Sequence, residues 1–254
     1  MRIYFFRFGL TFNFFVEGVD MKILVLNSYG VQQRDRPDNW IRSADFESSD
    51  AHLESRIEEQ TVYSVPAGEM FTGPLHTQLR EGLNQIRAHE QYGETTLDLY
   101  FPWYVYRVDR QRIPVGENDH IVHFDILPGS QNYDMSGFLE SMVALIEGYD
   151  LVFSTLRRED IVRLRGIFEV DRATTLIFLL AKSYKHVVNE DLPNLHVVKT
   201  GNDLANQLDG ATGYNLKGFV LKKLCEAACR DGFQVFEQVK QNPQCLIEIV
   251  LRGR

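Results

Sequence analysis

Residues 22–30 read KILVLNSYG, and Lys22–Asn27 is a short apolar run that ends in a polar side chain. An uninterrupted run of this length is typical of a strand that is buried on both faces, as in a parallel sheet. The following Ser28-Tyr29-Gly30 breaks the run and begins a polar loop. We therefore expect the first strand of a parallel sheet here, with chemistry-bearing residues at its carboxyl end.

Further apolar runs alternate with helical patterns along the chain, which predicts an α/β fold with a mostly parallel central sheet flanked by helices. Predicted strands are Gln60–Val65, Thr96–Phe101, Ile121–Ile126, Asp150–Thr155, Thr174–Ala181 and Leu195–Lys199. Predicted helices are Pro74–His89, Met135–Glu147, Arg158–Arg165 and Asn215–Arg230. Ser28–Ser55 is polar and is expected to be a long loop anchored by Trp40, and Trp103–His120 is expected to be irregular. No linker or repeat divides residues 21–254, so we expect a single domain.

The first 20 residues read differently from the rest. Met1–Val19 is rich in Phe, and Arg7 and Asn13 interrupt its apolar stretch. A signal peptide is disfavoured because no small-residue cleavage site follows. A strand or flap packed on the body is one alternative. We favour another, that Met21 is the natural start and residues 1–20 are an extension.

Composition indicates a globular cytoplasmic protein. No apolar run reaches the roughly 18 residues that a membrane span needs, so we expect no membrane partner. Cys225, Cys229 and Cys245 are expected to be reduced thiols, because no His or Cys pair at zinc-ligand spacing accompanies them, and we expect no metal or other cofactor. The net charge is −8, but residues 151–254 carry 15 Lys and Arg against 12 Asp and Glu. A local basic surface for DNA is compatible with that distribution.

In open parallel sheets, ligands bind beyond the carboxyl ends of the strands. That rule selects four segments of this chain, which are Asn27–Gly30, Phe101–Tyr104, Thr155–Arg158 and Lys182–Tyr184. Asn27 and Ser28 can bind a polar edge and Tyr29 can stack on a ring, although the same residues also suit a plain turn. Four aromatics lie in Phe101–Tyr106, where Phe101, Trp103 and Tyr104 form either a clamp for a flat ring or a hydrophobic plug.

Two further groups of residues are candidates for catalysis and phosphate binding. His123 and Asp125 share one face of an extended segment, as a general-base pair does, although such a pair is also common as a structural feature. Thr155 ends a predicted strand and runs into Arg157 and Arg158, which suits phosphate contacts, and Lys217 lies on the polar side of a predicted helix. Thr200–Asp203 is expected to cap a helix.

The order of these segments resembles that of the YaaA-like peroxide-stress and deazaguanine-associated proteins, which are related in fold to the uracil-DNA glycosylase superfamily. The similar stretches cover most of the chain after Met21. They are KILVLNSYG (22–30), VPAGEMFTGPLHTQLREGL (65–83), LDLYFPWYVYRV (97–108), IPVGENDHIVHFDI (113–126), YDLVFSTLRREDIVRL (149–164), TTLIFLLAKS (174–183) and LKGFVLKKL (216–224).

The chain departs from this family at two places. The family usually carries Cys and Lys in its first loop, where this chain has Asn27, Ser28 and Tyr29. After the third strand the family tends to carry a small-residue segment with Gly, where this chain has Phe101–Tyr106. Aromatic replacement suits a pocket for a planar base.

The resemblance implies a uracil-DNA-glycosylase-like fold and an N-glycosylase that excises a modified base from double-stranded phage DNA in antiviral defence. In that reading Asn27 holds the base, and Ser28, Tyr29, Phe101, Trp103 and Tyr104 surround it. Asp125, oriented by His123, positions water or stabilises the cationic sugar. Thr155, Arg157, Arg158 and Lys217 hold phosphates. Two alternatives are a non-catalytic DNA-binding stress protein and a hydrolase of free nucleosides or nucleotides. None of these needs an obligate protein partner.

Overall fold

Strand β1 (Met21–Leu26) forms the interior of a six-stranded sheet, as its apolar run predicts. The computed structural model describes residues 20–90, 92–93, 95–125, 135, 137–169, 172–181, 187–208 and 213–252. In this part of the chain β1 pairs in parallel with β3 (Thr95–Phe101) on one side and with β6 (Leu151–Ser154) on the other. All side chains of β1 except that of Lys22 are buried, because both faces of the strand are covered.

The sheet has the strand order β4-β3-β1-β6-β7-β8. Strands β7 (Thr175–Leu180) and β8 (Leu195–Lys199) extend it in parallel beyond β6. The short β4 (Val115–Gly116) pairs antiparallel with β3 at the opposite edge. The expectation of an α/β fold with a mostly parallel, helix-flanked sheet is confirmed.

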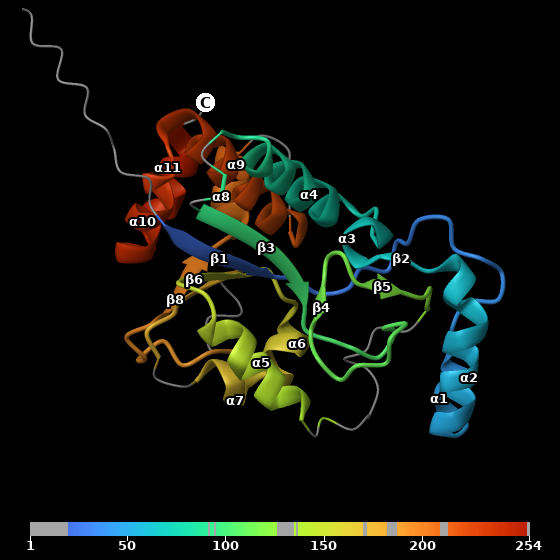
Figure 1. Ribbon diagram of the computed structural model, residues 1–254. Coiled ribbons are helices and arrows are strands. Elements are labelled where there is room, and N and C mark those ends of the chain that lie inside the picture. The colour runs from blue at the N-terminus through green and yellow to red at the C-terminus, as the bar shows by residue number, and fades with distance from the viewer. Residues whose placement is uncertain are drawn as a thin grey trace, which may run out of the picture.

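Helices cover both faces of the sheet (Figure 1). Helix α4 (Pro74–Arg87) connects β1 to β3 and lies on one face together with three carboxyl-terminal helices. These are α9 (Asn215–Asp231), α10 (Gln234–Gln241) and α11 (Cys245–Arg252). The other face carries α5 (Phe138–Glu147), α6 (Arg158–Arg163) and α7 (Arg165–Phe168). The chain after β1 therefore turns to one face, and the chain after β6 turns to the other.

Helices α4 and α9 cross at unusually close range because glycines lie at their contact. A β-carbon added to Gly218 would lie 2.5 Å from the backbone oxygen of Leu75, which is closer than real side chains approach. On α4, a β-carbon added to Gly82 would lie 3.0 Å from the Cα of Lys222. The two helices are thus packed backbone against backbone, and one of these contacts lies in the first turn of α4.

The expectation of a long loop over Ser28–Ser55 is wrong, because this region contains helix α1 (Ser43–Glu47) and the start of α2 (Asp50–Gln60). Helix α2 buries only Ile57 and Gln60, so it lacks the apolar stripe by which a helix is recognised in sequence. Capping supports it instead, since the Ser49 side chain accepts a hydrogen bond from the His52 backbone N–H.

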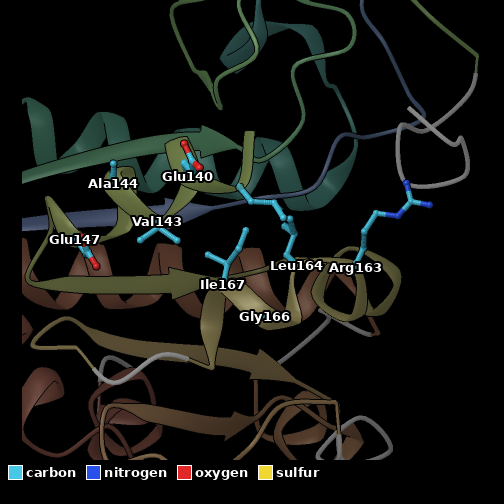
Figure 2. A pocket seen from close by; sticks show the side chains of 9 residues that line it. Glu140, Val143, Ala144, Glu147, Arg163, Leu164, Gly166 and Ile167 are labelled. Atoms are coloured by element: carbon cyan, nitrogen blue, oxygen red, sulfur yellow. The ribbon is translucent and has the colours of Figure 1, made fainter. Parts of the chain in front are cut away.

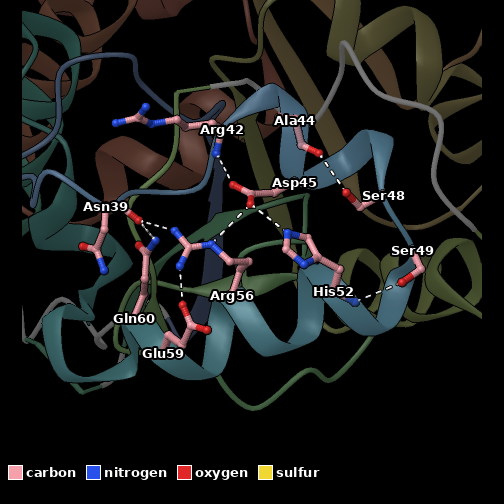
Figure 3. A network of polar contacts seen from close by, with 10 residues as sticks. All are labelled: Asn39, Arg42, Ala44, Asp45, Ser48, Ser49, His52, Arg56, Glu59 and Gln60. Atoms are coloured by element: carbon pink, nitrogen blue, oxygen red, sulfur yellow. Dashed lines mark hydrogen bonds and ion pairs between the residues drawn. The ribbon is translucent and has the colours of Figure 1, made fainter.

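A polar network around Asp45 holds α1 and α2 together (Figure 3). The buried Asp45 carboxylate accepts hydrogen bonds from the Arg42 backbone N–H at 2.7 Å, and from His52 Nε2 and Arg56 Nε at 3.2 Å each. Arg56 also donates to the backbone oxygen of Asn39 at 2.7 Å. Charge pairing around one buried carboxylate therefore replaces the apolar contacts that usually fix a helix pair.

Three other elements are shorter than the sequence predicts. The strand expected over Gln60–Val65 is a 3₁₀ turn, η1 (Thr61–Tyr63), followed by the two-residue β2 (Val65–Pro66). The strand expected over Ile121–Ile126 is reduced to β5 (His120–Ile121), which pairs antiparallel with β2, and Ile126 lies outside the described residues. The helix expected over Arg158–Arg165 breaks at Leu164 into α6 and α7. A single helical turn, α3 (Ala67–Met70), was not expected, whereas α8 (Asn202–Gln207) begins after Gly201 as predicted.

Two of the sequence expectations fall on residues outside the described ranges. These are the alternatives for Met1–Val19 and the strand-end segment Lys182–Tyr184. Within the described residues, no helix is both long and apolar enough to cross a membrane.

Candidate functional site

The carboxyl ends of β1 and β6 lie side by side at the point where the chain leaves the sheet toward opposite faces. Such a switch point leaves a crevice between the departing loops, and ligands of open parallel sheets bind there. Here the crevice is bounded by Asn27–Gly30 after β1, by Thr155–Arg157 after β6, and by the first turns of α4 and α9. The structure therefore brings together two of the four strand-end segments that the sequence selected, Asn27–Gly30 and Thr155–Arg158.

A chain of buried hydrogen bonds crosses the switch point. Thr155 Oγ1 donates to Asn27 Oδ1 at 2.9 Å, and Asn27 Nδ2 lies 2.9 Å from His76 Nδ1. All three side chains are buried. Because the Asn27 oxygen accepts from Thr155, its amide nitrogen is the group that faces His76 and donates to Nδ1. His76 then carries its proton on Nε2.

His76 is neutral at physiological pH. Burial lowers its pKa to about 3, and the positive charges of Arg80 and Arg157 act in the same direction. His76 is also the third residue of α4, where the positive end of the helix dipole further disfavours an imidazolium. The site thus presents a neutral imidazole with a fixed Nε2–H, which is a hydrogen-bond donor without a net charge.

Gly30 adjoins this imidazole. A β-carbon added to Gly30 would lie 2.7 Å from His76 Nε2 and 3.3 Å from the Cβ of Phe71. Any larger residue at position 30 would therefore displace the His76 ring. Glycine is required at position 30 because the His76 ring lies too close to the backbone for a β-carbon to fit.

A second polar cluster surrounds Asp160, whose side chain is fully buried. Its carboxylate accepts a hydrogen bond from the Ser28 hydroxyl, one from Trp103 Nε1 at 3.0 Å, and two from the Arg157 guanidinium at 3.2 and 3.3 Å. The Arg157 backbone N–H donates to Ser28 Oγ at 2.9 Å. A buried carboxylate is tolerated only when it is paired and hydrogen-bonded in this way. The cluster therefore fixes Arg157 against the end of β1.

Lys217 and Tyr214 close the site from the first turn of α9. Lys217 Nζ is buried and donates to the backbone oxygen of Leu156 at 2.6 Å. Burial lowers the Lys217 pKa to about 7, although the nearby Asp160 and Glu159 oppose the shift. The Tyr214 ring lies under the Lys217 ammonium at 5.1 Å, and burial raises the pKa of its hydroxyl.

Of these groups, Gly30, His76, Arg157 and Tyr214 line a cavity of about 360 Å³. It is lined by Tyr29, Gly30, Val31, Gln32, Gly73, Pro74, Leu75, His76, Arg157, Tyr214 and Asn215. Its volume lies in the range of pockets that hold small molecules. Among the described residues that line it there is no Asp or Glu, and Arg157 is its one charged side chain. The cavity thus offers hydrogen-bond donors and a positive charge.

The aromatic residues predicted to bind a base are mostly part of the core. Tyr29 and Phe101 are buried with ring centroids 5.3 Å apart, and Trp103 stacks on Phe138 at 5.9 Å. Tyr104 is half-buried against Phe138. Only Tyr29 among them lines the cavity. Their arrangement is that of a hydrophobic plug beneath the loop, which was the alternative interpretation of Phe101–Tyr106.

The predicted His123–Asp125 pair lies away from the cavity wall. His123 is buried, its Nε2 donates to the Arg34 backbone oxygen at 2.7 Å, and burial lowers its pKa. Asp125 is exposed, and its backbone N–H donates to the Ile41 oxygen. The contacts of His123 are those of a structural histidine that ties the loop after β1 to residues 120–125.

The predicted phosphate-binding residues also differ in their exposure. Thr155 and Lys217 are buried and bonded within the protein, so neither side chain faces solvent. Arg157 lines the cavity, and Arg158 is exposed at the first position of α6. Of the four, Arg157 is the residue that the structure places next to the cavity.

Sequence reasoning missed His76, Asp160 and Tyr214. A signal was present for the first two. His76 precedes Leu79 and Leu83 by three and seven residues, which puts a polar side chain on the apolar face of its helix. Asp160 adjoins Ile161 on the buried face of α6. Tyr214 carries no such signal, because its burial depends on how α9 packs.

A second, larger cavity lies between α5 and the α6–α7 segment (Figure 2). It measures about 610 Å³, and its walls are formed mainly by Val143, Ala144, Leu164 and Ile167, with Glu140, Glu147 and Arg163 also lining it. It contains none of the polar clusters described above. We therefore place the candidate site in the smaller cavity.

The described residues contain no group of three or more His, Cys, Asp or Glu placed to hold a metal ion. A scan against protein-family models and a search of curated proteins found no match to this chain.

Proposed function

We propose that this chain cleaves the N-glycosidic bond of a nucleoside unit whose base lies in the cavity beside His76. One observation carries the proposal, namely the neutral imidazole of His76, which lines the cavity and whose Nδ1 accepts a hydrogen bond from Asn27. The expected uracil-DNA-glycosylase-like fold is part of this proposal. The order of the parallel strands, with β1 between β3 and β6, is compatible with it.

The chemistry follows from the charge that the reaction creates. When the bond between the base nitrogen and C1′ of the sugar breaks, the base leaves with the electron pair and becomes negatively charged. A water oxygen then bonds to C1′, one water proton is released, and the departing base takes up a proton. A hydrogen-bond donor aimed at the base binds it more tightly as this charge develops, which lowers the barrier. A neutral imidazole whose pKa is lowered at a helix start can act as such an electrophile.

The remaining cavity residues suit a polar planar ligand. Tyr29 and Tyr214 are the two tyrosines among the described residues that line the cavity. The side-chain amides of Gln32 and Asn215 can donate to and accept from base edges or water. The DNA substrate and the role in antiviral defence remain predictions of the family resemblance.

The experiment is a search for released base. The protein is incubated with nucleosides, nucleotides and oligonucleotides that carry modified bases, and free base is measured by mass spectrometry. We expect release from at least one substrate, and a loss of about 10²–10³ in rate on His76→Phe, which keeps a ring but has no N–H, the cost typical of one removed oxyanion donor. His196→Phe, on β8, is the matched control and is expected to keep the wild-type rate. Absence of release from every substrate, or equal loss in both variants, would contradict the proposal.

A second candidate, binding without catalysis, is favoured by one specific observation. Within the described chain, no carboxylate lines the cavity to activate water. A protein of this kind would bind the ligand in the same incubations and return it unchanged. Equilibrium binding measured beside base release separates the two candidates.

A further inference from the structure

Among the described residues, the only charge in the wall of the candidate cavity is positive. Arg157 is the one charged side chain among the described lining residues, and 22% of its side-chain surface is exposed. The Nε and Nη2 groups of Arg157 donate hydrogen bonds to the Asp160 carboxylate. Because a guanidinium has five N–H donors, donors remain for a ligand, above all those of Nη1.

Two further features add positive potential at the same place. Arg80 lies close enough to His76 to disfavour its protonation, as does Arg157. Helix α4 also begins in the cavity wall, where Gly73–His76 line it. Pro74 has no N–H, so the amides of Leu75 and His76 are the first that the helix leaves without an intrahelical acceptor. An anionic group in the cavity would therefore meet donors and positive charge from several directions.

The arrangement suits one phosphate better than a polymer. Proteins that hold DNA contact several phosphates along the backbone. Of the residues expected to make such contacts, Thr155 and Lys217 are buried and bonded inside the protein. Arg157 lines the cavity, whereas Arg158 is exposed at the start of α6 and does not line it.

From this geometry we propose that the ligand is a free nucleoside monophosphate, with its base beside His76 and its phosphate on Arg157. This inference rests on the proposed function, because it names the substrate class of the same site. A charge-assisted contact between a guanidinium and a phosphate is frequently bidentate, so it also orients the nucleotide. The base is thereby directed to the His76 side of the cavity.

The test is calorimetric titration of the full chain with nucleoside 5′-monophosphates, the matching nucleosides, inorganic phosphate and a single-stranded oligonucleotide. We expect at least one monophosphate to bind about tenfold or more tightly than its nucleoside, as one charged hydrogen-bonded contact provides. It should also bind more tightly than inorganic phosphate. This comparison needs no variant, so it holds even if substitutions in the site fail to fold.

Variants then locate the phosphate. Arg157→Gln should weaken monophosphate binding more than nucleoside binding, so that the preference for the monophosphate disappears. Arg157→Lys keeps the charge but loses the planar fork, so we expect an intermediate preference. The matched control is Arg165→Gln on α7. This variant also removes an ion-paired arginine, whose partner is Glu169, and it should keep the preference for the monophosphate. Equal loss in Arg165→Gln would overturn the assignment.

Base release measured on the same samples separates this inference from the proposed function. Monophosphate binding that depends on Arg157 without base release would support the ligand class and contradict the glycosidase. Base release from the oligonucleotide, with no monophosphate binding, would support the glycosidase and overturn the ligand class. Equal affinity for nucleoside and monophosphate in the wild type would likewise overturn it.

Discussion

The side-chain amide of Asn27 donates to Nδ1 of His76 across 2.9 Å, and this contact joins the end of β1 to the first turn of α4. It decides which imidazole nitrogen carries the proton. Since Thr155 orients the Asn27 amide, the protonation pattern of His76 is set by a residue that follows a different strand, β6. Asn27 is thus a positioning residue, and its role can be tested through His76.

In Asn27→Ala, the His76 ring should no longer be held in a single tautomer. Without the amide donor, we expect the imidazole to populate both neutral tautomers, which ¹⁵N NMR of the ring nitrogens distinguishes. Loss of buried hydrogen bonds should also reduce the free energy of unfolding by about 1–3 kcal/mol. The His196 ring on β8 is an internal reference whose signals should not change. Unchanged His76 signals in the variant would show that Asn27 does not fix the tautomer.

His76 should make the protein sensitive to acid. Its pKa is about 3 in the folded chain against about 6.5 when unfolded, so between these values the unfolded state binds more protons. The free energy of unfolding should therefore fall by about 1.4 kcal/mol per pH unit, through this residue, as pH drops from 6.5 toward 3. The measurement is urea denaturation of wild type and His76→Gln across this range. Parallel curves would contradict the assignment.

Gly30→Ala should impair the site more than the fold. The added β-carbon meets His76 Nε2 at 2.7 Å, so the ring must move away from its position at the cavity. We expect ligand affinity to fall by about tenfold or more, with a destabilisation of about 1–3 kcal/mol from overpacking. Gly201→Ala is the matched control, because nothing lies within 4 Å of a β-carbon built there. A Gly30→Ala protein with wild-type affinity would show that the cavity tolerates a displaced His76.

Asp160→Asn should destabilise the protein through its buried partners. The variant keeps the shape of the side chain but loses the charge that pairs with Arg157, and it disturbs the hydrogen bonds from Ser28 and Trp103. We expect a loss of about 1–3 kcal/mol in the free energy of unfolding. Asp231→Asn removes the carboxylate of an exposed pair with Arg230 and should change stability little. Similar effects of the two substitutions would show that the Asp160 cluster contributes no more than a surface pair.

The sheet could be predicted because its strands are buried on both faces and therefore appear as apolar runs. The Lys22–Asn27 and Thr174–Ala181 runs both correspond to strands, with boundaries shifted by only one residue. Helix α2 could not be predicted in this way, because its stability comes from capping and from ion pairs around Asp45. Such contacts join residues whose proximity the sequence pattern does not show.

The sequence predicts where the candidate site lies, but it predicts only some of the residues that form it. The rule for strand ends selected Asn27 and Arg157, which lie at the crevice, but it equally selected Trp103, which is buried beneath it. What distinguishes these residues is the tertiary packing of α4 and α9, because the first turn of α4 brings in His76 and the residue that precedes α9 is Tyr214. No spacing within the sequence encodes that contact.

The close crossing of α4 and α9 at Gly218 means that a residue that does not line the cavity influences the cavity's width. Leu75, the residue that Gly218 touches, is the neighbour of His76, so the separation of the two helices sets how far one wall stands from the other. The size of the side chain at position 218 therefore determines how large a ligand the cavity accepts. An engineered chain that must accommodate a bulkier ligand would be altered first at this crossing, while the residues that contact the ligand are left as they are.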